Sequence, residues 1–188
     1  GGMAKGAWFR VALLGAACAA VGVGPGFGVP GGGGMRGGGP DATTATFVNW
    51  ETEQVHPVDM TPDGSKLLMC NTADNRLEVF DLSGSGPTLV AEIPVGLDPI
   101  SVRALSATRA WVVNNISDSL SVVDLAARNV IATLKTKDEP SDVVFAGTPL
   151  RAFVTCSQPN LVQVFDPSNL AAAPVEVAIK GKNPRALA

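Results

Sequence analysis

The sequence has few of the side chains on which catalysis and metal binding most often depend. Its 188 residues include one histidine, three cysteines and no tyrosine. The single histidine, His56, cannot form a zinc site without cysteine or carboxylate partners at suitable spacing. There is no Cys-x-x-Cys-His motif, which excludes covalent attachment of a c-type haem. We therefore predict no bound metal ion and no cofactor.

The common catalytic motifs are also missing. The chain contains no Gly-x-Ser-x-Gly elbow, no Walker loop and no His-Glu-x-x-His sequence. A Gly-x-Gly-x-x-Gly match at Gly32, Gly34 and Gly37 lies in a glycine-rich run that no strand precedes and no amphipathic helix follows. It therefore lacks the context that dinucleotide binding requires. No set of residues identifies a catalytic centre.

Basic residues and long apolar runs are scarce as well. The chain has 14 Lys and Arg against 17 Asp and Glu, and the three basic residues before position 41 leave 11 for the rest. A mildly acidic body without a basic cluster argues against a nucleic-acid partner. The apolar run at residues 11–21 is broken by glycine and is shorter than the roughly 20 residues of a membrane-spanning helix, so no transmembrane span is expected.

The N-terminal 40 residues have the composition of an export signal followed by a linker. Lys5 and Arg10 precede the short apolar run, and Ala17-Cys18-Ala19 has the spacing of a cleavage site, so we assign residues 1–21 to a signal peptide. Cys18 leaves open a lipid anchor. Residues 22–40 are rich in glycine and proline and are expected to be a flexible linker. This arrangement predicts a periplasmic or secreted protein.

Residues 41–188 contain an internal repeat. Prolines recur in steps of 42, 41 and 44 residues, at Pro57, Pro99, Pro140 and Pro184. Aspartates recur in steps of 43 and 42 residues, at Asp81, Asp124 and Asp166. The repeats run over about residues 57–98, 99–139 and 140–183, and a fourth begins at residue 184. A period of about 40 residues is typical either of a four-stranded propeller blade or of a helical repeat.

The content of each repeat favours strands over helices. Short segments rich in Val, Leu and Phe are bounded by Pro, Gly, Asn and Asp, which is strand-and-turn composition. The second strand of each repeat is a continuous apolar run, as expected for a strand covered on both faces. The aspartates at the end of the third strands are expected to cap the next turn. The strands are predicted at residues 58–61, 66–71, 76–81, 88–95, 100–105, 110–114, 120–124, 130–136, 141–145, 151–156, 161–166 and 175–179.

These repeats resemble the YVTN family of β-propeller repeat proteins. The likeness rests on Thr61-Pro62-Asp63-Gly64, Trp111-Val112-Val113-Asn114, Val122-Val123-Asp124 and Ile93-Pro94-Val95-Gly96, and it spans residues 57–188. The chain departs from the pattern in having no tyrosine, and the third repeat has no Pro-Asp-Gly turn. The predicted fold is all-β: a β-propeller of four-stranded antiparallel blades, with about three and a half blades present.

Because propellers close with four to eight blades, we interpret the chain as an incomplete ring. It is expected to be the N-terminal part of a longer propeller, or alternatively a short chain that completes its ring by oligomerising. The unpaired strand edge of the last blade would in either case favour self-association.

Ligand binding is expected on the propeller face that carries the loops after the fourth strands and between the second and third strands. The candidate positions on this top face are His56, Asp98, Glu139 and Asn114. The alternative is that these side chains cap turns by local hydrogen bonding. Cys70 and Cys156 are expected to be buried and unbridged, because they belong to repeats that are not neighbours.

Two functions are open from the sequence. The first is an exported scaffold that binds a protein or a small molecule at the top face or central channel without catalysis. The second is a fragment of a propeller enzyme or enzyme subunit, either a lactonase-like hydrolase or a subunit of a periplasmic dehydrogenase or reductase. The resemblance is compatible with both, because one fold hosts many functions.

Overall fold

The computed structural model describes residues 52–188, and all regular secondary structure in this range is β-strand. The predicted signal peptide, at residues 1–21, and the predicted linker, at residues 22–40, lie outside the described residues. No helix in the described part of the chain could cross a membrane.

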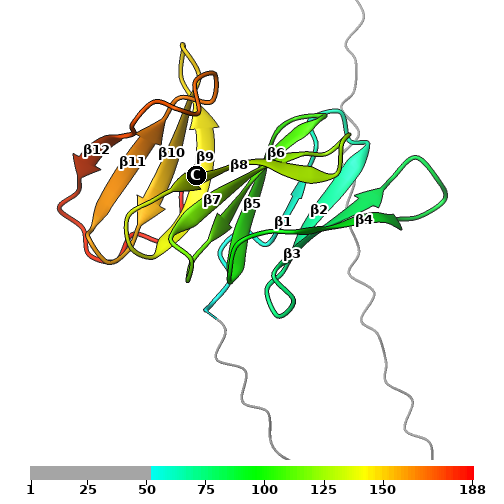
Figure 1. Cartoon of the computed structure of the whole chain (residues 1–188), viewed down its shortest axis with the longest axis horizontal. Helices are drawn as coiled ribbons and strands as arrows, with labels where there is room; N and C mark the ends of the chain where they lie inside the picture. The colour runs from blue at the N-terminus through cyan, green and yellow to red at the C-terminus, as the bar shows by residue number, and fades with distance from the viewer. Residues whose placement is uncertain (1–51) are drawn as a thin grey trace, which may run out of the picture. The chain divides into compact units, whose positions relative to one another are not determined.

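The strands form three four-stranded antiparallel sheets, each connected in simple sequence order (Figure 1). We call these sheets blades 1, 2 and 3. Blade 1 consists of β1 (Val58–Met60), β2 (Lys66–Asn71), β3 (Arg76–Asp81) and β4 (Thr88–Pro94). Blade 2 consists of β5 (Pro99–Ser106), β6 (Arg109–Asn114), β7 (Ser119–Asp124) and β8 (Asn129–Lys135). Blade 3 consists of β9 (Pro140–Ala146), β10 (Arg151–Cys156), β11 (Leu161–Phe165) and β12 (Val175–Ala178).

All twelve predicted strands are present, and each boundary lies within one residue of its predicted position. The agreement follows from the strength of the local signals, since alternating apolar residues bounded by turn residues define short strands. The first strands also lie side by side, with β5 packed against both β1 and β9.

The recurring aspartates cap turns, as predicted. Asp81 accepts hydrogen bonds from the backbone N–H and the hydroxyl of Ser83, and Asp166 does the same with Ser168. Asp124 accepts the backbone N–H groups of the two alanines that follow Leu125. The hydroxyl of Ser168, followed by its N–H, lowers the pKa of Asp166 below its usual value of 3.8. These carboxylates stabilise the turns in their charged form.

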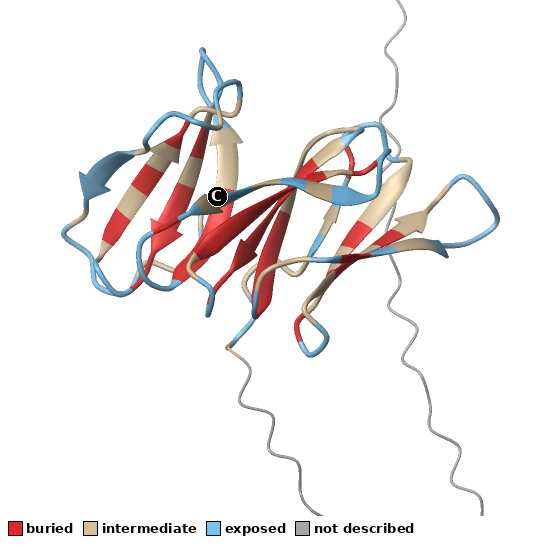
Figure 2. Cartoon of the chain, in the orientation of Figure 1, coloured by how far each residue is buried: buried red, intermediate tan, exposed pale blue. Residues whose placement is uncertain are grey.

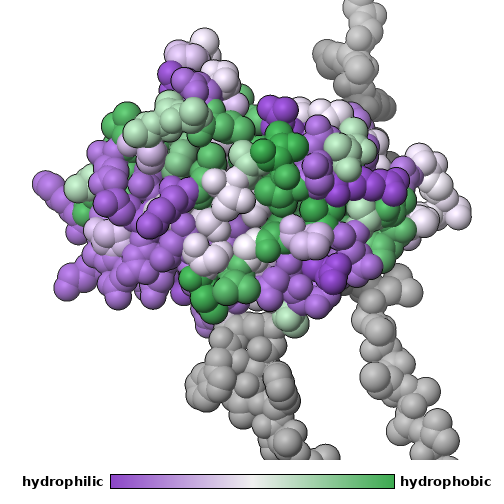
Figure 3. Space-filling model, viewed as in Figure 1, coloured by the Kyte–Doolittle hydropathy of each residue, from purple (hydrophilic) through white to green (hydrophobic). Residues whose placement is uncertain are grey.

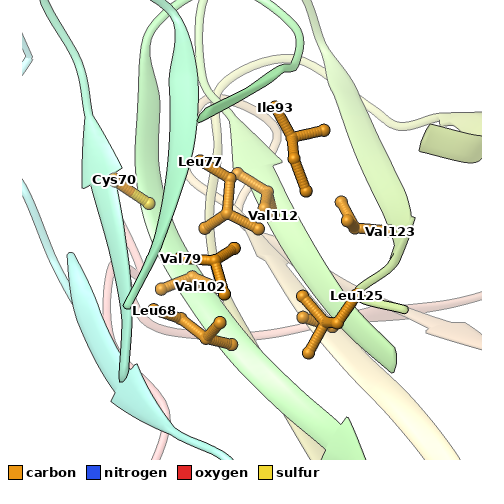
Figure 4. Close-up of a cluster of buried hydrophobic side chains, with 10 residues drawn as sticks. Leu68, Cys70, Leu77, Val79, Ile93, Val102, Val112, Val123 and Leu125 are labelled. Atoms are coloured by element: carbon orange, nitrogen blue, oxygen red, sulfur yellow. The ribbon is translucent and has the colours of Figure 1, made fainter. Parts of the chain in front are cut away.

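Two apolar clusters join the blades. The first lies between blades 1 and 2 and is built from alternate residues of facing sheets (Figure 4). Its members from blade 1 include Leu68, Leu77, Val79 and Ile93, and those from blade 2 include Val102, Ala110, Val112, Val123 and Leu125. Because side chains alternate between the two faces of a strand, the remaining residues of blade 2 are free to face blade 3.

The second cluster lies between blades 2 and 3 and is centred on Trp111. The Trp111 side chain is fully buried and makes edge-to-face contacts with Phe145 and Phe165, at ring-centroid distances of 5.5 and 6.2 Å. Val113, Leu120, Val143 and Val154 are among the other members. Edge-to-face pairs at such distances add to the stabilisation from burial alone.

The prediction that the second strand of each repeat is covered on both faces is confirmed only for blade 2. The second strand of blade 2, β6, is buried from Ala110 to Asn114, as expected for coverage on both faces. In β2 and β10, by contrast, alternate residues such as Met69 and Phe153 are only half-buried (Figure 2). Their apolar runs meet a neighbouring blade on one face alone within residues 52–188.

The two cysteines of the described chain are free and buried, in agreement with the sequence interpretation. Burial raises the pKa of Cys70 to about 12 and that of Cys156 to about 11. The thiolate is the reactive form of cysteine, so neither side chain is suited to be a nucleophile.

We predict that Trp111→Ala destabilises the fold strongly. Removing the indole leaves a cavity between blades 2 and 3, and we expect the free energy of unfolding to fall by about 3–5 kcal/mol. Urea denaturation followed by circular dichroism measures this change. Ile116→Ala is the control, because the Ile116 side chain is 61% exposed and should change stability little.

We also predict an acid-dependent role for Asp166. Its pKa is lower in the folded state, so its contribution to stability is present above pH 3.8 and is lost as the pH falls below that value. Wild type and Asp166→Asn should therefore differ in melting temperature at neutral pH and converge in acid. A difference that stays constant down to the lowest accessible pH would contradict this role.

Candidate functional site

Loops on one side of the blades connect each blade to the next. The residues before the repeated prolines, Asp98, Glu139 and Asn183, have φ angles of 60°, 52° and 53°. Their N–H groups donate to the side-chain Oδ1 atoms of Asn75, Asp118 and Asn160, at 2.7, 3.0 and 2.6 Å. A φ in this range is uncommon outside glycine, and short polar side chains tolerate it best.

The same loops also bind the following blade. The carbonyl of Asp98 accepts the N–H of Asn115, and that of Glu139 accepts the N–H of Ser157, both at 2.9 Å. These two candidate residues thus have a backbone role that joins consecutive blades. Their side chains differ: Asp98 is buried, whereas Glu139 is exposed. Glu139 is therefore the more accessible to a ligand.

A third set of contacts reinforces each junction. The residue after each second strand donates a side-chain hydrogen bond to the carbonyl of the next leading proline. Thr72 donates to Pro99, Asn115 to Pro140 and Ser157 to Pro184, at 2.8, 2.9 and 3.0 Å. The sequence signal for this contact is the small polar residue at this position in all three repeats.

Asn114 does not face solvent or the other candidates. It is fully buried, and its Nδ2 donates to the hydroxyls of Ser119 and Ser121 at 3.2 and 3.0 Å. A Cβ atom at Gly96 would lie 2.6 Å from Nδ2, so the glycine allows the loop before blade 2 to pass directly over Asn114. The next residue, Asn115, donates the hydrogen bond to the carbonyl of Pro140 in blade 3.

His56 occupies a different environment. Its Nδ1 lies 2.9 Å from Oδ2 of Asp142, whose side chain is fully buried, while the His56 side chain is 34% exposed. Asp142 belongs to β9, so this pair links the residue before blade 1 to the first strand of blade 3. Neither Asp98 nor Glu139, the acidic candidates, contacts the His56 ring.

Four donors converge on the carboxylate of Asp142. Besides His56, Oδ1 accepts the hydroxyl of Ser101 at 2.7 Å and the N–H of Val143 at 2.9 Å, and Oδ2 accepts the N–H of Leu187 at 2.7 Å. A buried carboxylate is tolerated only when such partners replace the water it has lost. We call His56, Ser101 and Asp142 the His–Asp centre.

The backbone positions the His56 ring at this centre. The N–H of Val102 donates to the carbonyl of His56 at 2.9 Å, and the N–H of Val55 donates to the carbonyl of Ile100 at 3.0 Å. These bonds form a parallel bridge between His56 and Ser101. The ring is therefore oriented by backbone contacts to blade 2 and by the carboxylate from blade 3.

The geometry determines which nitrogen of His56 can act on a ligand. A carboxylate accepts, so Nδ1 carries the proton in the pair with Asp142. Within residues 52–188 no hydrogen bond involves Nε2, which leaves this atom for a ligand or for proton transfer. The described residues contain no group of three His, Cys, Asp or Glu side chains that could hold a metal ion.

Sequence reasoning found His56 but missed Ser101 and Asp142. A signal was present: each lies two residues after a leading proline, in a strand whose neighbouring residues are mainly apolar. Asp59 has the same position in blade 1, and its Oδ2 accepts the N–H of Ala104 at 2.8 Å. The pattern alone could not identify which of these residues meets His56.

A polar hollow of about 280 Å³ lies on blade 3, on the side that carries the loops connecting the blades. It is lined by Glu139, Ser157, Gln158, Asn160, Lys182 and Asn183. These side chains offer hydrogen-bond donors and acceptors and one charge of each sign. Such a lining suits a polar ligand better than an apolar one.

The structure is similar to several solved proteins. Hydrazine synthase from Kuenenia stuttgartiensis aligns with a TM-score of 0.63 and 25% identity, over 74% of this chain and 40% of that one. A catalytically inactive variant of virginiamycin B lyase from Staphylococcus aureus, solved with quinupristin, has a TM-score of 0.56 and 14% identity over 69% and 43%. A candidate 6-phosphogluconolactonase from Bacteroides uniformis has a TM-score of 0.55 and 17% identity over 68% and 45%.

These similarities and the three four-stranded blades define the class: the described chain has a β-propeller fold. It spans less than half the length of each of these solved proteins. No family model and no curated protein sequence matches it.

We predict that Asp142→Ala lowers the stability of the chain by about 2–4 kcal/mol. The substitution removes the acceptor for four donors, and buried donors left without a partner are costly. Thermal unfolding measures the effect. Asp138→Ala is the matched control, because Asp138 is exposed, and a comparable loss in the two variants would contradict a central role for Asp142.

Proposed function

We propose that this protein is an exported ligand-binding β-propeller of the YVTN type, and that its ligand binds at the top face beside His56. The observation that carries the proposal is the His–Asp centre, in which a buried carboxylate holds a partly exposed imidazole whose Nε2 makes no hydrogen bond within residues 52–188. A few precisely placed polar groups are a common way to orient a small ligand.

The polar hollow of blade 3 supports ligand binding at the top face, although its lining does not include His56. Glu139 lines it, and Glu139 comes directly before β9, the strand that carries Asp142. A ligand with several hydroxyl or amide groups would find matching partners there. This chemistry favours a polar small molecule or an exposed peptide segment over an apolar compound.

The cellular location is part of the proposal. Residues 1–21 have the features of a secretory signal, which would bring the protein to the periplasm or the cell exterior, and Cys18 is the candidate residue for a lipid anchor. The repeat residues of the YVTN pattern support the family assignment.

A second candidate is that the chain is part of a propeller enzyme or of an enzyme subunit. The specific observation in its favour is the same His–Asp pair, because a carboxylate that orients an imidazole prepares the other ring nitrogen for proton transfer. A lactonase-like hydrolase and a dehydrogenase or reductase subunit are the forms considered. The enzyme names among the similar structures make both worth testing.

The single histidine makes a direct test possible. In an untagged, ¹⁵N-labelled chain, the long-range ¹H–¹⁵N spectrum of the imidazole contains signals from His56 alone. Quinupristin, 6-phosphogluconolactone and a mixed library of short peptides serve as probes. We expect a bound probe to shift the Nε2 signal and to bind at least about tenfold more weakly to His56→Gln, which can still donate to Asp142.

The same samples separate the two candidates. Binding without turnover supports the scaffold, whereas turnover of a probe that is lost in His56→Gln supports the enzyme. A probe that binds His56→Gln as tightly as wild type would show that the ligand site does not include His56. Glu92→Gln serves as a control substitution on an exposed residue of β4.

A further inference from the structure

Hydrophobic residues remain in contact with solvent in the described part of the chain (Figure 3). On blade 1, Val58 and Met60 are 46% and 49% exposed, and on blade 3, Val175 and Val177 are 65% and 48% exposed. These residues lie on the two blade faces that no other blade covers within residues 52–188. Exposed apolar patches of this kind mark interaction surfaces.

The uncovered face of blade 1 has the residue pattern of a blade interface. The closing aspartates and the strand pairing align the repeats, and Val58, Leu67, Met69 and Phe80 then take the positions of Val102, Ala110, Val112 and Val123 in blade 2. Those four residues of blade 2 are fully buried against blade 1. Blade 1 thus presents the apolar surface that packs on a preceding blade.

The uncovered face of blade 3 is the other half of the same interface. Phe153, Val162, Val164 and Val177 take the positions of Leu68, Leu77, Val79 and Ile93 in blade 1. Those residues of blade 1 are buried against blade 2. One chain therefore carries two complementary surfaces, and neither of them is complementary to itself.

A polar contact repeated at the blade junctions adds charge complementarity. The N–H of Gly96 donates to Ser121 at 3.4 Å, and the N–H of Lys137 donates to Gln163 at 2.9 Å. In the repeat alignment, Glu78 of blade 1 is equivalent to the acceptors Ser121 and Gln163. The exposed Lys180, which follows blade 3, is equivalent to the donors Gly96 and Lys137. A carboxylate and a lysine thus occupy the two halves that would meet.

We propose that two copies of this chain associate head to tail, with blade 3 of one copy packed on blade 1 of the other. Glu78 of one copy then accepts the N–H of Lys180 of the other and lies beside its ammonium group. The two surfaces differ, so the contact is heterologous, and the assembly either closes into a ring or extends. The proposal is independent of the ligand site at His56.

The test is the mass of the full chain by light scattering over a range of concentrations. We expect wild type to form a dimer or larger assembly. Met60→Glu and Val177→Glu should each raise the dissociation constant about a hundredfold, because each places an unpaired charge in the interface. Ile116→Glu introduces the same charge at a site outside both faces and should leave association unchanged.

Mixing the two variants tests the head-to-tail geometry. Met60→Glu retains an intact blade 3 face and Val177→Glu an intact blade 1 face, so an equimolar mixture should form dimers although each variant alone does not. A monomeric wild type would overturn the proposal and indicate that a segment of the same chain covers these faces. Association of either variant alone at wild-type strength would also overturn it.

Charge reversal provides a second pair that keeps the exposed apolar residues intact. Glu78→Lys and Lys180→Glu should each weaken association by at least about tenfold, because like charges then face each other. The double variant should recover most of the loss. Far-UV circular dichroism confirms that each variant is folded, and a double variant no better than the singles would contradict the assigned register.

Discussion

Each blade of this protein has two apolar faces, and packing of these faces against neighbouring blades buries the apolar surface that stabilises the fold. The middle blade shows the satisfied state: Val112 packs toward blade 1 and Trp111 toward blade 3, and both are fully buried. Because successive strand residues point to opposite faces, a continuous apolar run commits the sheet to two neighbours. The core of the molecule consists of the junctions between sheets.

The loops at these junctions have a structural and a functional consequence. A left-handed residue before Pro99, Pro140 and Pro184, such as Asp98, links the turn of one blade to that of the next. This leaves the backbone little freedom, so the exposed side chains on the same side are held in place. Glu139 is presented on such a framework, whereas His56 is held by its backbone bridge to Ser101 and by Asp142. Rigid presentation lowers the entropic cost of binding a ligand.

The predictions from sequence succeeded where the signals are local. The strands were placed within one residue, the turn role of the recurring aspartates is confirmed, and the free, buried state of Cys70 and Cys156 is confirmed. The candidate site was harder to predict. Asn114 proved to be buried beneath Gly96, and Asp98 and Glu139 do not meet His56, because equivalent positions in successive repeats lie around the blades and not at one point.

The sequence by itself determined the blade, because a 40-residue period, alternating apolar residues and turn residues act over a few neighbouring positions. Only the tertiary structure decided that His56 meets Asp142, which is 86 positions away, and that Ser101 joins them. Such a contact depends on the angle and distance between whole sheets. No local pattern encodes these quantities, and they arise when side chains of two sheets pack into a common core.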